Sequence, residues 1–265
     1  MKVWAIAAQK GGVGKTTTAV SLAGALVSQG ARVLMVDLDP HGSMTGYFGY
    51  DSNTVEPSIH AIFEAATQQL THPLNTLVLR MSVRNLTLIP SSTALVTLER
   101  RHGQRQGMGL VLKRALMGIA AQYDFCVLDC PPTLGVLVVN ALVAADLLVV
   151  PVQTDPLSAQ AVDRMLHTVH MIERSRKIPL PYLAVPTMFD RRTRASVDTL
   201  TALRARPDLN LWSGVIPVDT LFREASRVGQ PLTLFQPQAR GSQAYLNLAS
   251  ELMQEQTMRT EECVS

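Results

Sequence analysis

The segment 10–17, Lys-Gly-Gly-Val-Gly-Lys-Thr-Thr, constrains the fold of this chain more than any other feature. It follows an apolar run at 3–8 that reads as a buried strand, and it precedes an Ala- and Leu-rich run at 19–26 that reads as a helix. A phosphate-binding loop requires this order, because backbone N–H groups and the helix N-terminus then face the phosphates. A turn that merely needs glycines does not account for Gly-Lys-Thr at the start of the helix.

The residue types of this loop match the chemistry of a bound phosphate chain. Its three glycines let backbone N–H groups turn towards phosphate oxygens without a side chain in the way. Lys15 is placed to reach the β- and γ-phosphates, and the hydroxyl of Thr16 is placed to bind Mg²⁺. The predicted nucleotide-binding residues of the loop are Lys10, Gly11, Gly12, Val13, Gly14, Lys15, Thr16 and Thr17.

Aspartates follow two further apolar runs that read as strands. Asp37 and Asp39 come after the run 32–36, and Asp129 comes after the run 125–128. Ligands of open α/β sheets bind at the carboxyl ends of parallel strands. Phosphoryl transfer there needs positioning and charge neutralisation more than covalent chemistry. One such aspartate is equally well a turn former, but three beside a phosphate loop indicate a site.

The loop departs from the general phosphate-loop pattern, which has a glycine where this chain has Gln9, followed by Lys10. In this form it resembles the deviant Walker ATPases of the ParA/MinD superfamily. The resemblance implies that Lys10 reaches across an ATP-dependent sandwich homodimer to the partner's nucleotide. It also implies that Asp39 positions or activates the attacking water, that Asp37 supports the metal side, and that Asp129 helps hold the Mg²⁺ shell through water. The predicted catalytic residues are Lys10, Lys15 and Asp39, and the predicted metal-site residues are Thr16, Asp37 and Asp129.

The resemblance covers nearly the whole chain. In the family, the position of Thr187 and the loop after Pro217 lie near the adenine, so we expect both to contact the base. The family has Gln-Gly-Asn after its Asp-Pro pair, whereas this chain has His41-Gly42-Ser43. His41 either contacts the nucleotide or lies in the switch loop, and we favour the loop. The segments that carry the wider resemblance are 140–146, 151–153, 187–193 and 216–225.

We expect a single α/β domain over residues 1–265, with a doubly wound, mostly parallel sheet and helices on both faces, as in P-loop NTPases. An apolar content of 47% with 17% charged residues suits a sheet buried on both faces. The apolar run 134–152 is long enough to span a membrane, but its polar residues and Pro151 divide it into a helix at 135–144 and a strand at 147–152. Further predicted strands are 86–89, 183–186 and 212–216, and further predicted helices are 108–121, 157–173 and 243–256.

Composition also bounds the compartment and the membrane contacts. Cys126, Cys130 and Cys263 form no Cys-x-x-Cys pair, which fits a reducing cytosol, and no signal segment opens the chain. From residue 241 on, one arginine faces four glutamates. An acidic tail does not bind anionic lipid, so we expect a cytoplasmic protein without direct membrane insertion.

We expect an ATPase that is slow alone and stimulated by a partner. The switch sequence, together with Val218 where partition members carry an arginine after Ile-Pro, resembles the ParC branch, which places chemotaxis receptor arrays at bacterial cell poles. That resemblance implies a protein cargo adaptor, a polar anchor and concentration at the pole. The alternative is a chromosome- or plasmid-segregation ATPase that binds DNA weakly and without sequence preference, since 189–227 holds seven arginines against five acidic residues. A third reading is a synthetase of the same fold that uses ATP to activate a carboxylate.

Overall fold

A seven-stranded sheet forms the centre of the protein, in the order β3-β4-β2-β5-β1-β6-β7. The structure is a computed structural model that describes residues 1–103 and 105–262, with side chains described to Glu255. All neighbouring strands pair in parallel except β3, which runs antiparallel at one edge. The strands are β1 (Lys2–Ile6), β2 (Val33–Asp37), β3 (Leu79–Arg80), β4 (Leu86–Ile89), β5 (Phe125–Asp129), β6 (Leu147–Gln153) and β7 (Tyr182–Thr187).

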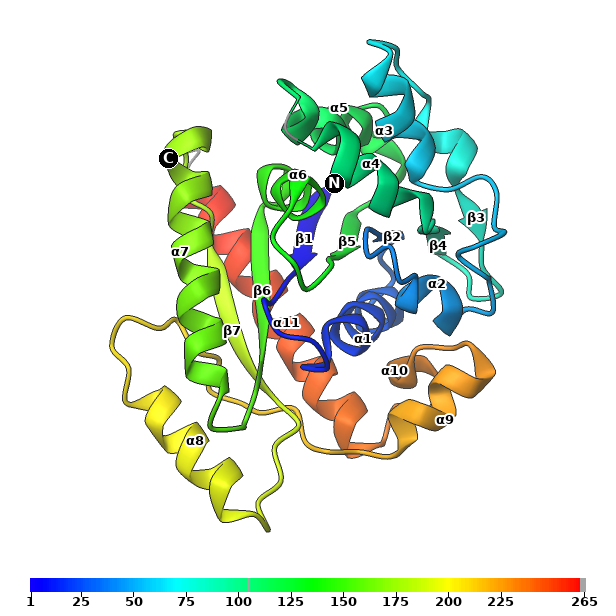
Figure 1. Ribbon diagram of the computed structural model, residues 1–265. Helices are drawn as coiled ribbons and strands as arrows, with labels where there is room; N and C mark the ends of the chain where they lie inside the picture. Colours follow the sequence, from blue (N-terminus) through cyan, green and yellow to red (C-terminus); the bar gives the residue numbers. More distant parts are fainter. Residues whose placement is uncertain (104, 263–265) are drawn as a thin grey trace.

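Helices cover both faces of this sheet (Figure 1). The strands therefore read as continuous apolar runs rather than as alternating ones, and every residue of β2 is buried. The longer helices are α1 (Lys15–Ser28), α3 (His60–Thr67), α4 (Ala94–His102), α5 (Val111–Met117), α6 (Val136–Ala144), α7 (Ser158–Arg176), α8 (Arg194–Arg204), α9 (Leu221–Val228) and α11 (Arg240–Glu262). The short ones are α2 (Ser43–Tyr47), α10 (Leu232–Phe235) and the 3₁₀ turns η1 (Leu74–Leu77), η2 (Met108–Leu110) and η3 (Ala120–Gln122).

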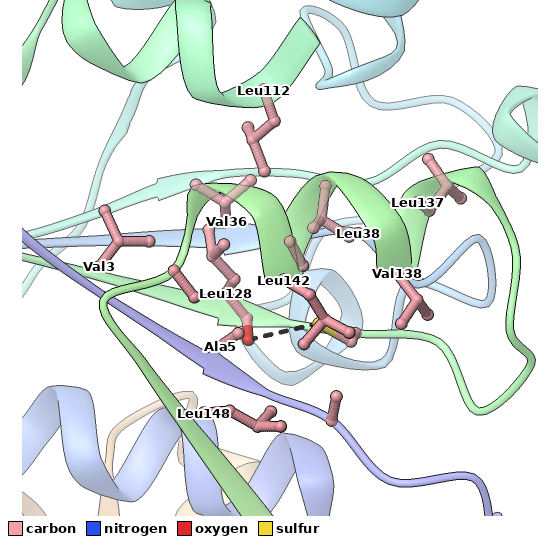
Figure 2. Packing of buried hydrophobic residues seen from close by; sticks show 14 of the residues in the cluster. Val3, Ala5, Val36, Leu38, Leu112, Leu128, Leu137, Val138, Leu142 and Leu148 are labelled. Atoms are coloured by element: carbon pink, nitrogen blue, oxygen red, sulfur yellow. Dashed lines mark hydrogen bonds between the residues drawn. The ribbon is translucent and has the colours of Figure 1, made fainter. Parts of the chain in front are cut away.

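Alternate residues of the strands feed two separate cores. Trp4 and Ile6 of β1 pack with the apolar residues of α1 and α11. Val3 and Ala5 point to the other face, where α5 and α6 lay Leu112 and other leucines over the sheet (Figure 2). This two-sided burial confirms the predicted doubly wound sheet, and it fixes the ends of the strands relative to the loops that follow them.

The apolar run 134–152 divides as predicted, into α6 and β6, and both are buried. No helix in the part of the chain that the structure describes is long and apolar enough to cross a membrane. Cys263 lies outside the described residues, as do the side chains of the predicted acidic tail beyond Glu255.

One predicted strand is wrong, and one predicted helix is interrupted. The predicted strand 212–216 is replaced by isolated bridges, Ala184 to Leu211 and Phe189 to Pro217. Between them the ring of Trp212 folds over Gly214, where a Cβ would lie 2.6 Å from the ring, and the N–H of Ile216 donates to the Pro186 carbonyl oxygen at 2.8 Å, so the segment follows the sheet edge without forming a regular strand. The predicted helix 108–121 breaks into η2, α5 and η3, because glycines at 109 and 118 weaken it.

Candidate nucleotide and metal site

The phosphate loop joins β1 to α1 and leaves the first N–H groups of the helix open. Gly12 and Gly14 have φ of 73° and 92°, in the left-handed region that favours glycine. No side chain caps the first turn of α1, so its free N–H groups and its dipole point at the loop, as anion binding requires. Lys15 is the first residue of the helix, and its Nζ donates to the carbonyl oxygen of Lys10 at 3.2 Å.

Asp129 is buried behind the phosphate loop, at the carboxyl end of β5. Its Oδ2 accepts a hydrogen bond from the hydroxyl of Thr16 at 2.7 Å. Its Oδ1 is buried and has no hydrogen-bond partner among the described residues. Burial raises the pKa of Asp129 well above its usual value, and the neighbouring carboxylate of Asp37 raises it further. A buried carboxylate oxygen without a donor, next to a hydroxyl, suits a divalent cation.

Asp37 pairs with Asp129 in the register of β2 and β5, so the two carboxylates leave the sheet side by side. Its Oδ1 accepts from the backbone N–H of Asp39 at 3.1 Å, and its Oδ2 accepts from the N–H and hydroxyl of Thr45 at 2.8 and 2.7 Å. Burial raises the pKa of Asp37 to about 7 against the effect of these donors. Sequence reasoning missed Thr45, which fixes the orientation of this carboxylate.

Asp39 starts the loop that follows β2. Its Oδ1 accepts from the backbone N–H of His41 at 3.0 Å and lies 2.9 Å from His41 Nδ1. The hydroxyl of Ser91 donates to the Asp39 carbonyl oxygen at 2.6 Å. The His41 ring is 81% exposed, so the histidine lies in the switch loop and contacts Asp39 from the solvent side.

The side chain of Lys10, the first residue of the phosphate loop, is paired with an aspartate of its own chain in this structure. Its Nζ forms an ion pair with Asp155 Oδ1 at 3.0 Å, just after β6. The same oxygen accepts the N–H of Leu157 at 2.9 Å, and the hydrogen bond from Lys10 lowers the pKa of Asp155. Sequence reasoning missed this partner, because the only local signal was an Asp-Pro pair before a helix.

Thr187 lies beneath the loop, where its hydroxyl donates to the Val13 carbonyl oxygen at 2.8 Å. The following Met188 packs its terminal methyl 3.9 Å from the position that a Cβ on Gly14 would take. Pro217 is held beside this segment by its bridge to Phe189. Thr187 therefore supports the loop backbone, and its contact with the adenine, like that of Pro217, stays a prediction.

Glu99 of α4 is a further group that sequence reasoning missed. Its carboxyl packs against Gly135, and its Oε1 accepts the Leu137 N–H at the first turn of α6 at 3.5 Å. Burial raises the pKa of Glu99, with Asp39 as a lesser cause. Glu99 thus holds the far end of the loop that begins at Asp129.

Comparisons with known proteins agree with this arrangement. A family model described as an AAA domain matches residues 1–181. The sporulation initiation inhibitor protein Soj of Bacillus subtilis is 34% identical over 252 residues, which are 95% of this chain and 98% of that protein. The chromosome partitioning protein ParA of Caulobacter vibrioides is 34% identical over 96% of this chain and 94% of its own length.

Two solved structures extend the comparison. A cobyrinic acid a,c-diamide synthase from Mycobacterium smegmatis, with bound ATP analogue and magnesium, superposes with a TM-score of 0.83 at 32% identity, over 97% of this chain and 96% of that one. A Cyanothece McdA variant in complex with ATP has a TM-score of 0.82 at 24% identity, over 96% of each chain, and shows that the fold is shared.

Proposed function

This chain belongs to the ParA-like family of P-loop ATPases with an AAA domain, and from that membership we propose that it is an ATP-driven dimerising switch. The observation that carries the proposal is the Thr16–Asp129 pair behind an uncapped helix N-terminus, with Asp129 Oδ1 left without a donor. ATP with Mg²⁺ fits this site, because the open N–H groups suit phosphate and the orphaned oxygen suits the metal shell.

Each residue of the site has a role that follows from its position. Lys15 and the N–H groups of the loop bind and orient the phosphates, and Thr16 and Asp129 hold the metal side. Mg²⁺, when bound, neutralises charge on the phosphate oxygens. Asp37 lies beside Asp129 and supports it, since its own oxygens are occupied by backbone and hydroxyl donors. Asp39 is left to orient the attacking water.

Dimerisation requires Lys10 to change partner. In this structure its ammonium is neutralised within its own chain by Asp155, 36% exposed. An exposed ion pair of this kind is worth about 0–1 kcal/mol, so it restrains Lys10 only weakly. A nucleotide on a second copy of the chain carries more negative charge than one carboxylate. We propose that Lys10 exchanges Asp155 for that nucleotide when the ATP-bound dimer forms.

A calorimetric titration of ATP with and without Mg²⁺ tests the site. The wild type binds ATP more tightly with Mg²⁺, and Asp129→Asn loses most of that increment but keeps its affinity for metal-free ADP. Asp124→Asn, at the other end of β5, is the matched control and keeps the full increment. Equal increments in wild type and Asp129→Asn overturn the assignment.

We propose that the switch positions a macromolecular cargo through a protein adaptor, with chemotaxis arrays at a cell pole as the cargo that the switch sequence favours. Positioning through a protein adaptor, rather than through DNA, is supported by the ion pairs that arginines in the C-terminal part of the chain form with aspartates. Arg192, Arg194 and Arg206 each form an ion pair with an aspartate, which reduces what they offer to a DNA backbone. The related chromosome partitioning proteins ParA favour chromosome segregation as the second candidate.

Retention on duplex DNA distinguishes these two functions. The ATP-bound Asp39→Ala dimer is passed over a non-specific duplex at physiological salt. Weak retention that falls steeply with salt supports the protein route, because each phosphate contact adds about 0.9 to the slope of log affinity against log salt. Tight retention that is abolished by Arg191→Ala with Arg223→Ala, but not by Arg174→Ala with Lys177→Ala, moves the function to segregation.

The synthase among the solved structures keeps a third function in view, an ATP-dependent synthetase. The two classes differ in what they need for turnover. A switch releases phosphate from ATP with Mg²⁺ alone, whereas a synthetase needs a carboxylate substrate to consume its activated phosphate. Phosphate release with ATP and Mg²⁺ as the only additions, lost in Lys15→Ala, supports the switch.

A further inference from the structure

A cavity lies between α3, the chain that follows it, and α5. It has a volume of about 330 Å³. This falls at the lower end of the range of ligand pockets, about 300–1,000 Å³. In Figure 1, α3 and α5 lie at the opposite end of the sheet from the phosphate loop, so this cavity is separate from the nucleotide site. Its lining is mainly aliphatic and includes Ile62, Leu70, Leu74, Val111, Ala115 and Ile119.

Large apolar side chains are exposed in and near this cavity. Leu70, which lines it, is 61% exposed, and Met117, a further residue of α5, is 72% exposed. Lys113 and Arg114 stand one turn before Met117 on the same helix, so the three share one face. Methionine adapts its shape to different apolar partners. An apolar hollow bordered by exposed apolar side chains is a feature of protein-binding surfaces.

The elements around this cavity carry a net positive charge. Residues 60–77 and 94–122, without 104, contain five Lys or Arg residues and two acidic residues, so their net charge equals the +3 of the whole chain. Both acids are engaged: Glu64 lies 3.7 Å from His60, and Glu99 is turned towards α6. Among the described residues, no hydrogen-bond or ion-pair partner is found for the side chains of Arg100, Arg101, Lys113 and Arg114.

Two of the five basic residues, Arg105 and Arg114, lie at the cavity itself. Arg114 lines it, and Arg105 donates to the Thr67 carbonyl oxygen at the end of α3, beside the lining residue Ala66. An unpaired guanidinium at the edge of an apolar hollow recognises a carboxylate whose neighbours bury aliphatic groups.

We propose that the cavity between α3 and α5 is the docking site for an acidic amphipathic helix of a partner protein. The aliphatic side chains of that helix fill the hollow, and its carboxylates pair with Arg105, Lys113 and Arg114. Charge complementarity favours an acidic partner, and the helix-in-groove mode suits a hollow between two helices. Duplex DNA matches the charges but has no aliphatic side chains to fill the hollow.

This inference extends the proposed function, on which it rests for the identification of the partner as a cargo adaptor. A surface at the far end of the sheet leaves the nucleotide face free for a second copy of the chain. Partner and nucleotide then bind at the same time. The docking surface itself is tested without nucleotide, so its failure and the failure of the ATPase assignment are separate results.

The probe is a fluorescein-labelled helical peptide of about 16 residues, with leucine at i, i+3, i+4 and i+7 and glutamate on the flanks. Its affinity for the full chain is measured by fluorescence anisotropy. Lys113→Glu with Arg114→Glu weakens binding at least about tenfold through charge repulsion. Arg174→Glu with Lys177→Glu, the same charge change at the C-terminal end of α7, leaves it unchanged. Ala115→Phe, which fills the hollow, weakens binding without changing any charge.

Control probes decide between occupants. A peptide with lysine for glutamate, or with serine for leucine, does not bind if the inference is right. Equal weakening by both charge-reversal pairs, no effect of Ala115→Phe, or no binding of the acidic peptide overturns it. A labelled duplex that loses binding in Lys113→Glu with Arg114→Glu, while the peptide does not, reassigns the surface to nucleic acid. Should Ala115→Phe fail to fold, Ala66→Phe fills the hollow from α3.

Discussion

Replacing Gly135 by alanine tests the contact between Glu99 and the start of α6. A Cβ on Gly135 would lie 1.9 Å from Glu99 Oε1 and 2.7 Å from its Cδ, so the carboxyl group has to move. The backbone of Gly135 is extended, with φ of −153°, which any residue adopts. The substitution therefore acts through this one clash, and its main consequence is loss of the acceptor for the Leu137 N–H.

The magnitude follows from what the carboxyl group does at that helix end. Gly135 offers no side-chain cap, so Glu99 is the acceptor that serves the first turn of α6. Loss of such a cap costs about 0.5–2 kcal/mol, and loss of a carboxylate near a helix N-terminus costs about 0.3–1 kcal/mol. Because the hydrogen bond is long, at 3.5 Å, we expect about 1–2 kcal/mol in total. For a chain of this size that lowers Tm by about 2–8 °C.

A double-mutant cycle measured by urea unfolding isolates the contact. Gly135→Ala and Glu99→Ala each lower the free energy of unfolding by about 1–2 kcal/mol. In the Glu99→Ala background nothing remains for the new methyl group to displace, so Gly135→Ala then changes stability by less than about 0.5 kcal/mol. If the two effects add, Glu99 does not act through Gly135 and the reasoning is refuted.

Three further predictions concern the nucleotide, the dimer and pH. Lys15→Ala lowers ATP affinity by about 1.5–3 kcal/mol in calorimetry, the value of a hydrogen bond to a charged group, and unchanged affinity contradicts the site. With ATP, light scattering finds Asp39→Ala as a persistent dimer and Lys10→Ala as a monomer; a monomeric Asp39→Ala excludes the sandwich. Arg32 lowers the pKa of Asp124 from 3.8 to about 2, so the pair stabilises the fold above pH 4 and loses this effect as the pH falls towards 2. Asp124→Asn then costs at most about 1 kcal/mol at pH 7 and nothing at pH 2, by denaturant unfolding.

The sheet was predictable because its signals are local and strong. Apolar runs bounded by Asp-rich or Gly-rich turns gave β1, β2 and β5, and the phosphate loop fixed the order of strand and helix around it. The segment 212–216 failed for the opposite reason. Its first residue, Trp212, folds its ring over Gly214 and donates to Glu251, a contact 39 residues away that no local pattern contains.

The partners of the site residues were not predictable. Asp155 and Glu99 reach Lys10 and α6 from 145 and 38 residues away, and only the packing of the sheet decides that they arrive there. The residue types at the strand ends predicted binding sites for a metal ion and for phosphate. They did not indicate which carboxylate would keep one oxygen without a donor, and that is the property that distinguishes Asp129 from Asp37.

The net charge of a segment is a poor guide to its binding of anionic partners where its basic side chains form ion pairs with acidic ones. The segment 189–227 and the surface of α4 and α5 are both basic by count, but Arg192 and Arg206 bind Asp190 and Asp208 through fork-like contacts. Such an arginine has to release its aspartate before it can bind a phosphate, and the released carboxylate then repels that phosphate from close by. The cations Lys113 and Arg114 have no such exchange to make, because no acidic group within the described part of the chain engages them. When two surfaces carry similar numbers of cations, the one whose cations are unpaired attracts an anionic partner more strongly. The cavity between α3 and α5 is therefore the better place to look for the adaptor.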